Sequence, residues 1–445
     1  MSIQSALAPQ TWPFQDKDLP PSAYLVGGCV RDALLNRRTA YLDLDFVLPQ
    51  AAVETARRVA SNCNAGFVLL DAERDIARVV FPEATADFAL QVGNSLEEDL
   101  QRRDFTINAI AYHPFSDTLI DPLGGQQDLD ARLLRMIAPQ NLADDPLRLM
   151  RAYRQAAQLG LSLEQHTQAT ICQLIPKLAG VAAERIKVEL GYLLSDSSAT
   201  PWIHQLWQDG LLRQSFPHAS KTSLAFLSAI DEAAGLLQHH APGFAAALPQ
   251  ALNQRAQGKE AAQRTLLSTA KWIGLVADCP SRAETTLKHM KFSRGEIHVL
   301  TRLLTSWPRL QELIDQGQYT RADQFHLFEA AGGTFPAVVM VTLAAHLIQQ
   351  RAEPPDPGVQ LAYLQKLEPW IGEYLDPFSD LAHPKPPVSG SVLMKALNLS
   401  PGPQVGCLLS QLTLAQAEGQ VSTPEEALEL AQQLIHSPLA MTENG

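Results

Sequence analysis

The sequence is poor in the features that mark secreted, metal-stapled or membrane-spanning proteins. It has five cysteines among 445 residues, an odd number with no C-x-x-C pair, which argues against a disulfide framework and against a structural zinc site. No uninterrupted apolar run approaches the roughly 18 residues of a transmembrane helix, and the first residues lack the basic and apolar regions of a signal peptide. We therefore expect a protein of the reducing cytoplasm that does not contact a membrane.

Several recognition patterns are missing as well. We find no internal repeat and no low-complexity tract, and Gly27-Gly28 lacks the G-x-G-x-x-G spacing of a nicotinamide-type dinucleotide site. Basic residues are also fewer than acidic residues: the chain has 35 Lys and Arg residues and 47 Asp and Glu residues, which gives a net charge of −12. Taken alone, this balance argues against a nucleic-acid binder, although it does not exclude a local basic groove.

The residues that are present fit a modular globular protein. Apolar residues make up 46% of the chain and charged residues 18%, a usual balance for a protein with a buried core, and the length accommodates roughly two to four domains. Strand and helix patterns alternate from 24 to about 120, as in an α/β unit, whereas only helix patterns recur from about 138 onward. The proline-rich segments 353–358 and 383–387 are expected joints between helical modules.

The stretch that organises the α/β unit covers residues 24 to 46. A short buried strand breaks at Gly27-Gly28, a helix pattern containing Arg31 follows, and the next strand carries Asp43 and Asp45. Side chains two positions apart on a strand point to the same face, so these carboxylates repel each other unless a cation lies between them. Mg²⁺ is the natural candidate because it prefers carboxylate and phosphate oxygens. The alternative is a solvated strand end beside an ordinary turn.

Asp87 is a candidate third carboxylate for the same site. The expected strands of the α/β unit are 24–26, 43–48, 66–70, 76–81 and 85–90, and the expected helices are 29–36, about 50–62 and 97–101. From the last strand Asp87 is placed to face Asp43 and Asp45, which would complete a two-metal site. An aspartate at a strand edge with no catalytic role explains it equally well.

A second charged segment follows this strand after a few residues. Ser95 and Glu98 have the spacing of a helix-starting capping box. Arg102 and Arg103 come at the end of that helix, and Asn108 lies in the apolar run that follows. A buried amide needs a hydrogen-bonding partner, so we expect Asn108 to bond backbone or to position a loop.

A helix with a charged row is predicted to begin at Pro146, which suits a first helical turn. Four charged residues recur at every third position, and they are Asp145, Arg148, Arg151 and Arg154. This spacing predicts one polar row along the helix, whose alternative interpretation is a solvated basic face with an intrahelical ion pair. The helix pattern at 181–194, which includes Glu189, is expected to pack against this row and orient its arginines.

Farther along, Lys288, Lys291 and Arg294 form a small basic cluster that either contacts phosphate or keeps a helix soluble.

Five motifs in sequence resemble one family. They are GGCVRD with DLD, RRDFTINAIA, DPLGGQQDL, DDPLR and ERIKVE, all between residues 24 and 195. In order and spacing the chain resembles the class II, or bacterial-type, tRNA nucleotidyltransferase/poly(A) polymerase family of the polymerase-β-like superfamily. The resemblance is weaker over 387–432. It implies an α+β fold, in which a polymerase-β-like nucleotidyltransferase head with a mixed sheet and helices is followed by an all-α neck, body and tail.

The resemblance also implies a division of labour along the chain. The implied domains are a catalytic head over 1–137, a neck for base recognition over 138–200, a helical body over 201–352 and a tRNA-binding tail over 353–445. In the head, Asp43 and Asp45 would hold the catalytic Mg²⁺ ions. Gly27, Gly28 and Arg31 would contact the triphosphate, and Arg103 matches the nucleotide-contacting arginine of the RRD motif.

In the neck, Asp145 and Arg148 match the pair that reads the incoming base, and Arg151 and Arg154 continue the row. Cytosine and adenine each present an amine donor beside a ring-nitrogen acceptor, so a carboxylate that accepts and a guanidinium that donates match both bases. Uracil and guanine present the reverse order. The implied reaction is therefore template-independent addition of C or A to a tRNA 3′ end, from CTP and possibly ATP, with pyrophosphate released at a two-metal site.

The expected RNA surface lies on one concave face. It would be lined by Arg148, Arg151, Arg154, Lys187, Lys288 and Lys291, with Arg294 beside the last two. Such a surface would read the shape of the stacked acceptor and TψC arms of tRNA rather than a sequence.

Two departures from the family pattern bear on specificity. The usual Glu-Asp pair is Asp144-Asp145 here, and only 57 positions separate Asp45 from Arg102. Full CCA-adding members usually carry a flexible loop in that interval, and members without it tend to stop after two cytidines. We therefore expect a CC-adding enzyme. The alternatives are full CCA addition, A addition, a poly(A) polymerase or a non-catalytic RNA-binding relic. A poly(A) polymerase should carry extra basic sequence in its tail to bind RNA of any kind, and the acidic C-terminus here lacks it.

Overall fold

The computed structural model describes residues 7, 9–37, 41–250, 264–276, 279–350 and 357–436. The chain divides into two compact units, Met1–Pro217 and His218–Gly445, and each is described by itself. The expected boundary between 352 and 353, with most of the proline-rich joint 353–358, lies outside the described residues.

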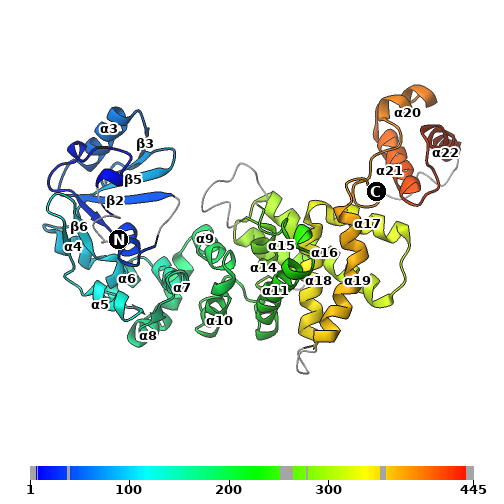
Figure 1. Ribbon diagram of the computed structural model, residues 1–445. Helices are drawn as coiled ribbons and strands as arrows, with labels where there is room; N and C mark the ends of the chain where they lie inside the picture. The colour runs from blue at the N-terminus through cyan, green and yellow to red at the C-terminus, as the bar shows by residue number, and fades with distance from the viewer. Residues whose placement is uncertain are drawn as a thin grey trace. The chain divides into compact units, whose positions relative to one another are not determined.

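The first unit is built on a seven-stranded mixed sheet in the order β3-β4-β5-β2-β1-β6-β7 (Figure 1). The strands are β1 (Tyr24–Val26), β2 (Leu42–Leu48), β3 (Gly66–Asp71), β4 (Ile76–Val80), β5 (Ala84–Leu90), β6 (Ala111–His113) and β7 (Thr118–Ile120). The β2–β5 pair is parallel and the other pairs are antiparallel. The predicted α/β alternation and the mixed sheet are thereby confirmed.

The two faces of this sheet differ in character, as the two-residue period of a strand requires. On one face Leu44, Phe46 and Phe88 are fully buried, and the rings of the last two stack with centroids 5.2 Å apart. Helix α3 (Ala52–Cys63) packs against β3, β4 and β5, and Trp12 closes the same core with its ring 5.2 Å from that of Phe46. The alternate residues of β2 and β5, which include the aspartates, therefore point away from the core.

The other helices of the first unit lie between the strands of the sheet or follow its last strand. They are α2 (Gly28–Leu34) between β1 and β2, then α4 (Leu96–Gln101), α5 (Gly125–Asp130), α6 (Pro139–Asp144), α7 (Leu147–Leu159), α8 (Gln165–Leu174), α9 (Ala183–Leu194) and α10 (Thr200–Gln208). The expectation that no strand recurs after about 138 is wrong in one detail, because Ser162–Leu163 (β9) pairs in parallel with Leu133–Leu134 (β8). A pair of two-residue strands leaves too little sequence to show a period of two.

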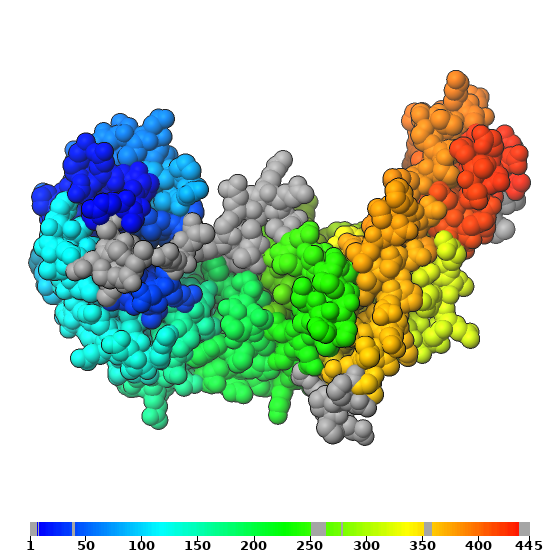
Figure 2. Space-filling view, viewed as in Figure 1, coloured from blue at the N-terminus to red at the C-terminus, as the bar shows by residue number. Residues whose placement is uncertain are grey.

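The described residues of the second unit contain helices and no paired strands. The α-helices are α11 (Lys221–His240), α12 (Pro242–Ala245), α14 (Leu266–Lys271), α15 (Pro280–His289), α16 (Arg294–Gln316), α17 (Arg321–Ala331), α18 (Phe335–Gln350), α19 (Pro357–Leu375), α20 (Gly390–Leu397), α21 (Pro403–Ala417) and α22 (Pro424–His436). Helix α18 packs against both α11 and α16. Helices α20 to α22, orange to red in Figure 2, surround a small core that includes Leu393, Leu412 and Ala427.

One segment of the second unit has the length and the apolar composition of a membrane-spanning helix. Among the described residues, Arg321–Gln350 has the length and composition to cross a bilayer, but 78% of its most apolar window is buried inside the protein. It is also two helices, α17 and α18, divided by a 3₁₀ turn at Gly332–Thr334. Counting uninterrupted apolar runs did not single it out, and its burial is that of a core helix.

Candidate active site

The three aspartates lie on one face of the sheet. Parallel register places Asp45 on β2 directly opposite Asp87 on β5, and Asp43 opposite Thr85. The Thr85 hydroxyl donates a hydrogen bond of 2.6 Å to Asp43, and Arg78 on β4 donates two bonds, of 2.6 and 2.7 Å, to the two oxygens of Asp87. The structure therefore brings together the three carboxylates that the sequence analysis singled out.

Asp45 is the electrostatically unfavourable member of this group. Burial, reinforced by the negative charges of Asp43 and Asp87, raises its pKa from 3.8 to about 7, against the opposing effect of Arg103 and Arg78. A divalent cation between Asp43 and Asp45 would relieve this repulsion, and hard carboxylate oxygens suit Mg²⁺. Within the described ranges, no three His, Cys, Asp or Glu side chains form a group that could hold a metal ion. The residues thus fit a cation on the Asp43–Asp45 pair, with Asp87 engaged by Arg78.

A glycine turn lies against the carboxylates. Gly27 joins β1 to α2 with φ 75° and ψ −134°, a backbone conformation that is essentially reserved for glycine. A Cβ at this position would lie 3.3 Å from Nη1 of Arg103 and 3.4 Å from Oδ2 of Asp45. The absence of a side chain therefore leaves room for the backbone of the turn to approach a ligand at the carboxylates.

Two arginines flank the turn with different partners. Arg103 bonds Asp99 at 3.1 Å, while its buried Nε has no hydrogen-bond partner in the described part of the chain. A buried donor without an acceptor is costly, whereas Nη1 of the same guanidinium lies beside the Gly27 turn. Arg31 instead donates to Asp32 at 2.9 Å and to Asn108 at 2.7 Å, which confirms that the buried amide of Asn108 has partners.

Sequence reasoning missed two buried residues that tie these segments together. Asp104 accepts hydrogen bonds from Asn108 at 2.8 Å and from Arg151 at 3.2 Å, and Gln155 bonds both Asn108 and Arg31. Burial alone would raise the pKa of Asp104, but Arg151, Asn108, Arg148 and the Phe105 backbone together lower it. The signal was present, because Asp104 is the acid of the RRD motif and directly precedes an apolar run.

The polar row of the next helix is formed only in part. Helix α7 begins at Leu147, and Asp145 precedes it with extended backbone (φ −131°, ψ 90°), so the prediction that Asp145 lies on the helix is wrong. The residue before a proline is biased away from helical backbone. Asp145 pairs with Arg185 of α9 at 3.3 Å, while Arg148 donates to the backbone carbonyls of Arg102 and Asn141.

The remaining arginines of the row are held by other elements. Arg151 lies 3.2 Å from Asp104, and Arg154 lies 2.5 Å from the buried carboxylate of Glu189. Because Glu189 belongs to α9, which packs against α7, the prediction that 181–194 packs on this helix and orients its arginines is confirmed for Arg154, whereas the ion-pair partner of Arg151 comes from the RRD motif. The intrahelical ion pair offered as the alternative is not found among these four residues. The carboxylates that pair with Arg151 and Arg154 come from outside α7, although Arg154 also bonds Gln158 within the helix.

The basic residues predicted to contact RNA lie on helices or in the turn between two helices. Lys187 lies on α9 of the first unit. In the second unit Lys288 is exposed near the end of α15, where it pairs with Glu284 at 2.6 Å. Lys291 follows in left-handed backbone (φ 57°), and Arg294 is the exposed first residue of α16. These three basic residues therefore surround the turn between α15 and α16, and their role stays a prediction.

The connection from β5 to α4 is short. β5 ends at Leu90 and α4 begins at Leu96, so residues 91–95 form the whole link, as the sequence predicted. Ser95 accepts from the Glu98 backbone at 3.3 Å, but the Glu98 carboxylate accepts from the Asn94 backbone at 2.7 Å rather than from Ser95. The expected capping box is thus formed in one direction only.

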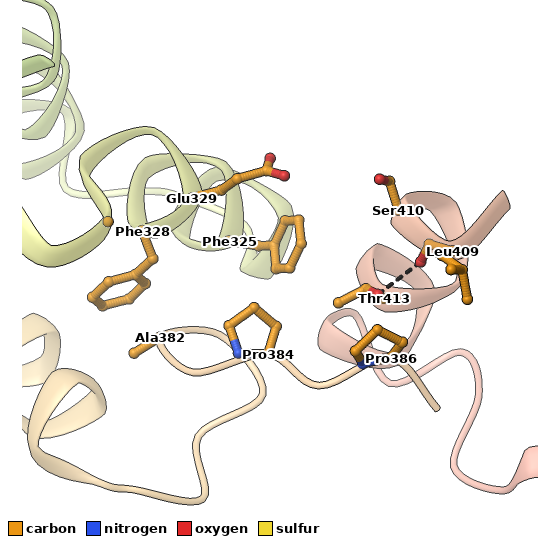
Figure 3. A pocket seen from close by; sticks show the side chains of 10 residues that line it. Phe325, Phe328, Glu329, Ala382, Pro384, Pro386, Leu409, Ser410 and Thr413 are labelled. Atoms are coloured by element: carbon orange, nitrogen blue, oxygen red, sulfur yellow. Dashed lines mark hydrogen bonds between the residues drawn. The ribbon is translucent and has the colours of Figure 1, made fainter. Parts of the chain in front are cut away.

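A cavity of about 310 Å³ lies in the second unit and has a different character (Figure 3). Phe325 and Phe328 of α17, Pro384 and Pro386, and Thr413 of α21 contribute to its lining, which contains no lysine or arginine. None of the residues predicted to bind metal, nucleotide or RNA lines it, so it is not a candidate for the same chemistry.

Comparisons with known proteins bear on both units. A family model of the poly A polymerase head domain matches residues 23–135, and one of the probable RNA and SrmB-binding site of polymerase A matches 160–222. The chain is 41% identical to a CC-adding tRNA nucleotidyltransferase of Synechocystis sp., with 96% of each chain covered. It is 33% identical to an A-adding tRNA nucleotidyltransferase of Deinococcus radiodurans, over 92% of this chain and 94% of the relative. A solved CCA-adding enzyme in complex with CTP has the same fold, with a TM-score of 0.64 at 21% identity, over 93% of this chain and 91% of that one.

Proposed function

Because this chain belongs to the tRNA nucleotidyltransferase/poly(A) polymerase family, we propose that it adds cytidines to the 3′ end of tRNA without a template and stops after CC. The substrates are tRNA and CTP, and the product other than the extended tRNA is pyrophosphate. The observation that carries the stop at CC is the five-residue link 91–95 between β5 and α4. It leaves no room for the long loop that full CCA-adding members usually carry there.

The carboxylate face supports the chemical step of this proposal. Nucleotidyltransferases of this type generally use divalent metal ions, and we assign Mg²⁺ to Asp43 and Asp45, with Asp87 beside them. When bound, Mg²⁺ activates the attacking 3′ hydroxyl and neutralises the phosphates. The Gly27-Gly28 turn brings backbone close to the triphosphate, and the guanidinium of Arg103, whose Nη1 lies beside Gly27, supplies a charged donor to it. Arg31 is held in place for the same task by Asp32 and Asn108.

Base selection is assigned to Asp145 and Arg148. Asp145 accepts from the exocyclic amine of cytosine, and Arg148 donates to its ring nitrogen and carbonyl. Each is positioned by a neighbour: Arg185 pairs with Asp145, and the carbonyls of Arg102 and Asn141 hold Arg148. Arg151 and Arg154 continue the row behind this pair, where Asp104 and Glu189 fix them.

The rest of the chain is assigned to tRNA. The family model over 160–222 has an RNA-binding site in its name, and Lys187 of α9 lies within that range. Lys288, Lys291 and Arg294 at the α15–α16 turn would contact backbone phosphates of the acceptor and TψC arms, so binding should weaken as salt rises. We assign the protein to the cytoplasm, which is consistent with a tRNA substrate.

Single-nucleotide extension of one labelled tRNA tests the proposal. The tRNA is prepared in three forms, ending at the discriminator base, at C, and at CC. Each form is given Mg²⁺ with CTP, with ATP, or with both, and products are separated at single-base resolution. We expect growth to CC with CTP and no further growth when ATP is present. Completion of CCA would overturn the stop at CC, and long A tracts would favour a poly(A) polymerase.

A variant with Asp43→Ala and Asp45→Ala is the matched control. It should keep tRNA binding, because these carboxylates repel phosphate and contribute nothing to backbone contacts, yet it should incorporate no nucleotide. Retained incorporation would rule out the assigned metal site. If the wild-type protein binds tRNA but incorporates nothing on any of the three substrates, the chain is a non-catalytic RNA-binding relic.

A further inference from the structure

Arg78 is the charged residue of the carboxylate face that the proposed reaction does not use. It stands on β4 directly opposite Asp87 of β5, which in turn stands opposite Asp45 of β2. Directly opposed residues of a sheet point to the same face, so the three side chains form one row across the strands. The Nε and Nη2 atoms of Arg78 lie 2.6 and 2.7 Å from the two oxygens of Asp87.

This two-bond geometry engages both oxygens of Asp87. A carboxylate that accepts a guanidinium fork has fewer lone pairs left for a metal ion, and its orientation is fixed by two parallel bonds. The charge of Arg78 also reaches beyond its direct partner. The pKa of Arg78 is raised, first by the hydrogen bond that it donates to Asp87 and, against the opposing effect of burial, also by the negative charges of Asp87, Asp43 and Asp45.

We propose that Arg78 is a positioning residue and a built-in counter-ion of the carboxylate group: it holds Asp87 beside Asp45, and its positive charge opposes the binding of a divalent cation at Asp43 and Asp45. The inference rests on the proposed function for the identity of the cation. The competing explanation is an ordinary cross-strand ion pair that adds only stability, since the side chains of Arg78 and Asp87 are 40% and 21% exposed. The two explanations differ in what they predict for metal binding.

Removing the charge of Arg78 should strengthen metal binding. A positive charge two strand spacings from a doubly charged ion repels it even in a solvent-like environment, so Arg78→Gln should lower the Mg²⁺ concentration for half-maximal effect by about fivefold or more. The readout is the rise in melting temperature of EDTA-treated full-length protein as Mg²⁺ is titrated without nucleotide. Nucleotide incorporation should nevertheless fall, because Asp87 loses its fixed orientation.

Arg74→Gln is the matched control. Arg74 lies four residues away on the same β3–β4 hairpin, its side chain is 80% exposed, and its contact with Asp71 is 3.7 Å. The Arg74→Gln substitution removes the same charge at a residue that does not contact the three aspartates. The Mg²⁺ concentration for its half-maximal effect, the Mg²⁺ midpoint, should therefore stay within twofold of the wild-type value. Arg78→Lys is the second variant, which keeps the charge and loses the fork, and it should keep the wild-type midpoint while incorporation falls.

The outcomes separate this inference from the proposed function. A lower midpoint in Arg78→Gln alone supports the inference. Equal midpoints in Arg78→Gln and Arg74→Gln, or a shift in Arg78→Lys as large as that in Arg78→Gln, would overturn it in favour of an ordinary ion pair. If Mg²⁺ stabilises none of these proteins, the inference fails together with the metal assignment. Cytidine addition by the wild-type protein, measured separately, then decides the proposed function.

Discussion

Asp104 and Arg151 form an ion pair, 3.2 Å long, between the segment that carries the RRD motif and helix α7. Asp104 is buried, with only 6% of its surface exposed, and it also accepts from Asn108 and from the Phe105 backbone. Asp104 directly follows Arg103 in the chain. Its carboxylate therefore links the RRD motif to helix α7, which also carries Arg148. The pair therefore couples the nucleotide-phosphate side of the proposed site to its base-reading side.

Replacing Asp104 with Asn should destabilise the protein markedly. The change leaves Arg151, whose side chain is 37% exposed, without the charge of its buried partner, and this loss should cost about 1–3 kcal/mol of unfolding free energy, less than for a pair buried on both sides. Urea denaturation at pH 7 measures this, with Glu312→Gln as the control, because Glu312 belongs to an exposed pair with Arg309 whose loss costs less than about 1 kcal/mol.

The same variant has a defined pH dependence. Because the pKa of folded Asp104 lies below its ordinary value, the carboxylate contributes stability above the unfolded pKa and loses it as the pH falls through the folded pKa. The difference between Asp104→Asn and wild type should therefore shrink in acid. A constant difference from neutral to acidic pH would contradict this assignment.

Asp45→Asn should stabilise the metal-free protein at alkaline pH. The folded pKa of Asp45 is raised from 3.8 to about 7, so the folded state holds this proton more tightly than the unfolded state. The stability contributed by Asp45 therefore falls as pH rises from about 4 to about 7. In EDTA at pH 8 the variant should melt at least about 2–4 °C above wild type, with little difference at pH 4. Added Mg²⁺ should raise the melting temperature of wild type only. A variant that melts below wild type at pH 8 would contradict the prediction.

Gly27→Ala should lower both stability and triphosphate affinity. Alanine does not tolerate φ 75° with ψ −134°, at a cost of about 1–3 kcal/mol, and its Cβ would press on Arg103 and Asp45. Gly28→Ala is the control for stability, since Gly28 is helical and a Cβ there meets only Nη2 of Arg31, at 3.5 Å. Urea denaturation and CTP titration compare the two variants. Equal losses of stability in both would show that the backbone of Gly27 is not the cause.

Asp145→Ala should relax the choice between CTP and UTP. If Asp145 accepts from the cytosine amine, its removal should reduce the ratio of kcat/KM for CTP over UTP by about 10- to 100-fold. Arg185→Gln, which removes only the exposed partner of Asp145, should change the ratio by less, about two- to fivefold. Single-turnover incorporation on tRNA ending in C measures both. An unchanged ratio in Asp145→Ala would remove this residue from base selection.

The local chemistry of the sheet was predictable from the sequence because it depends on short periods. Alternation of apolar and polar residues in 42–48 and 84–90 places Phe46 and Phe88 on one face and the aspartates on the other whatever the rest of the chain does. A glycine pair after a three-residue strand likewise predicts a turn. The motif order was enough to identify the family, and the shortness of the link after the strand that carries Asp87 followed from counting the 57 positions between Asp45 and Arg102.

Tertiary structure alone decided which charges meet. No periodicity relates Arg78 to Asp87, Asp104 to Arg151, or Arg154 to Glu189, since strand register and helix packing bring them together. Asp145 differs, because its sequence spacing suggested a helical row but its extended backbone is what the following Pro146 favours, so a local rule was available for it. Sequence determined the residues available for catalysis and the faces they occupy, because those follow from local geometry. The partners that set their charge and orientation come from distant segments, and only the folded chain places them within hydrogen-bonding distance.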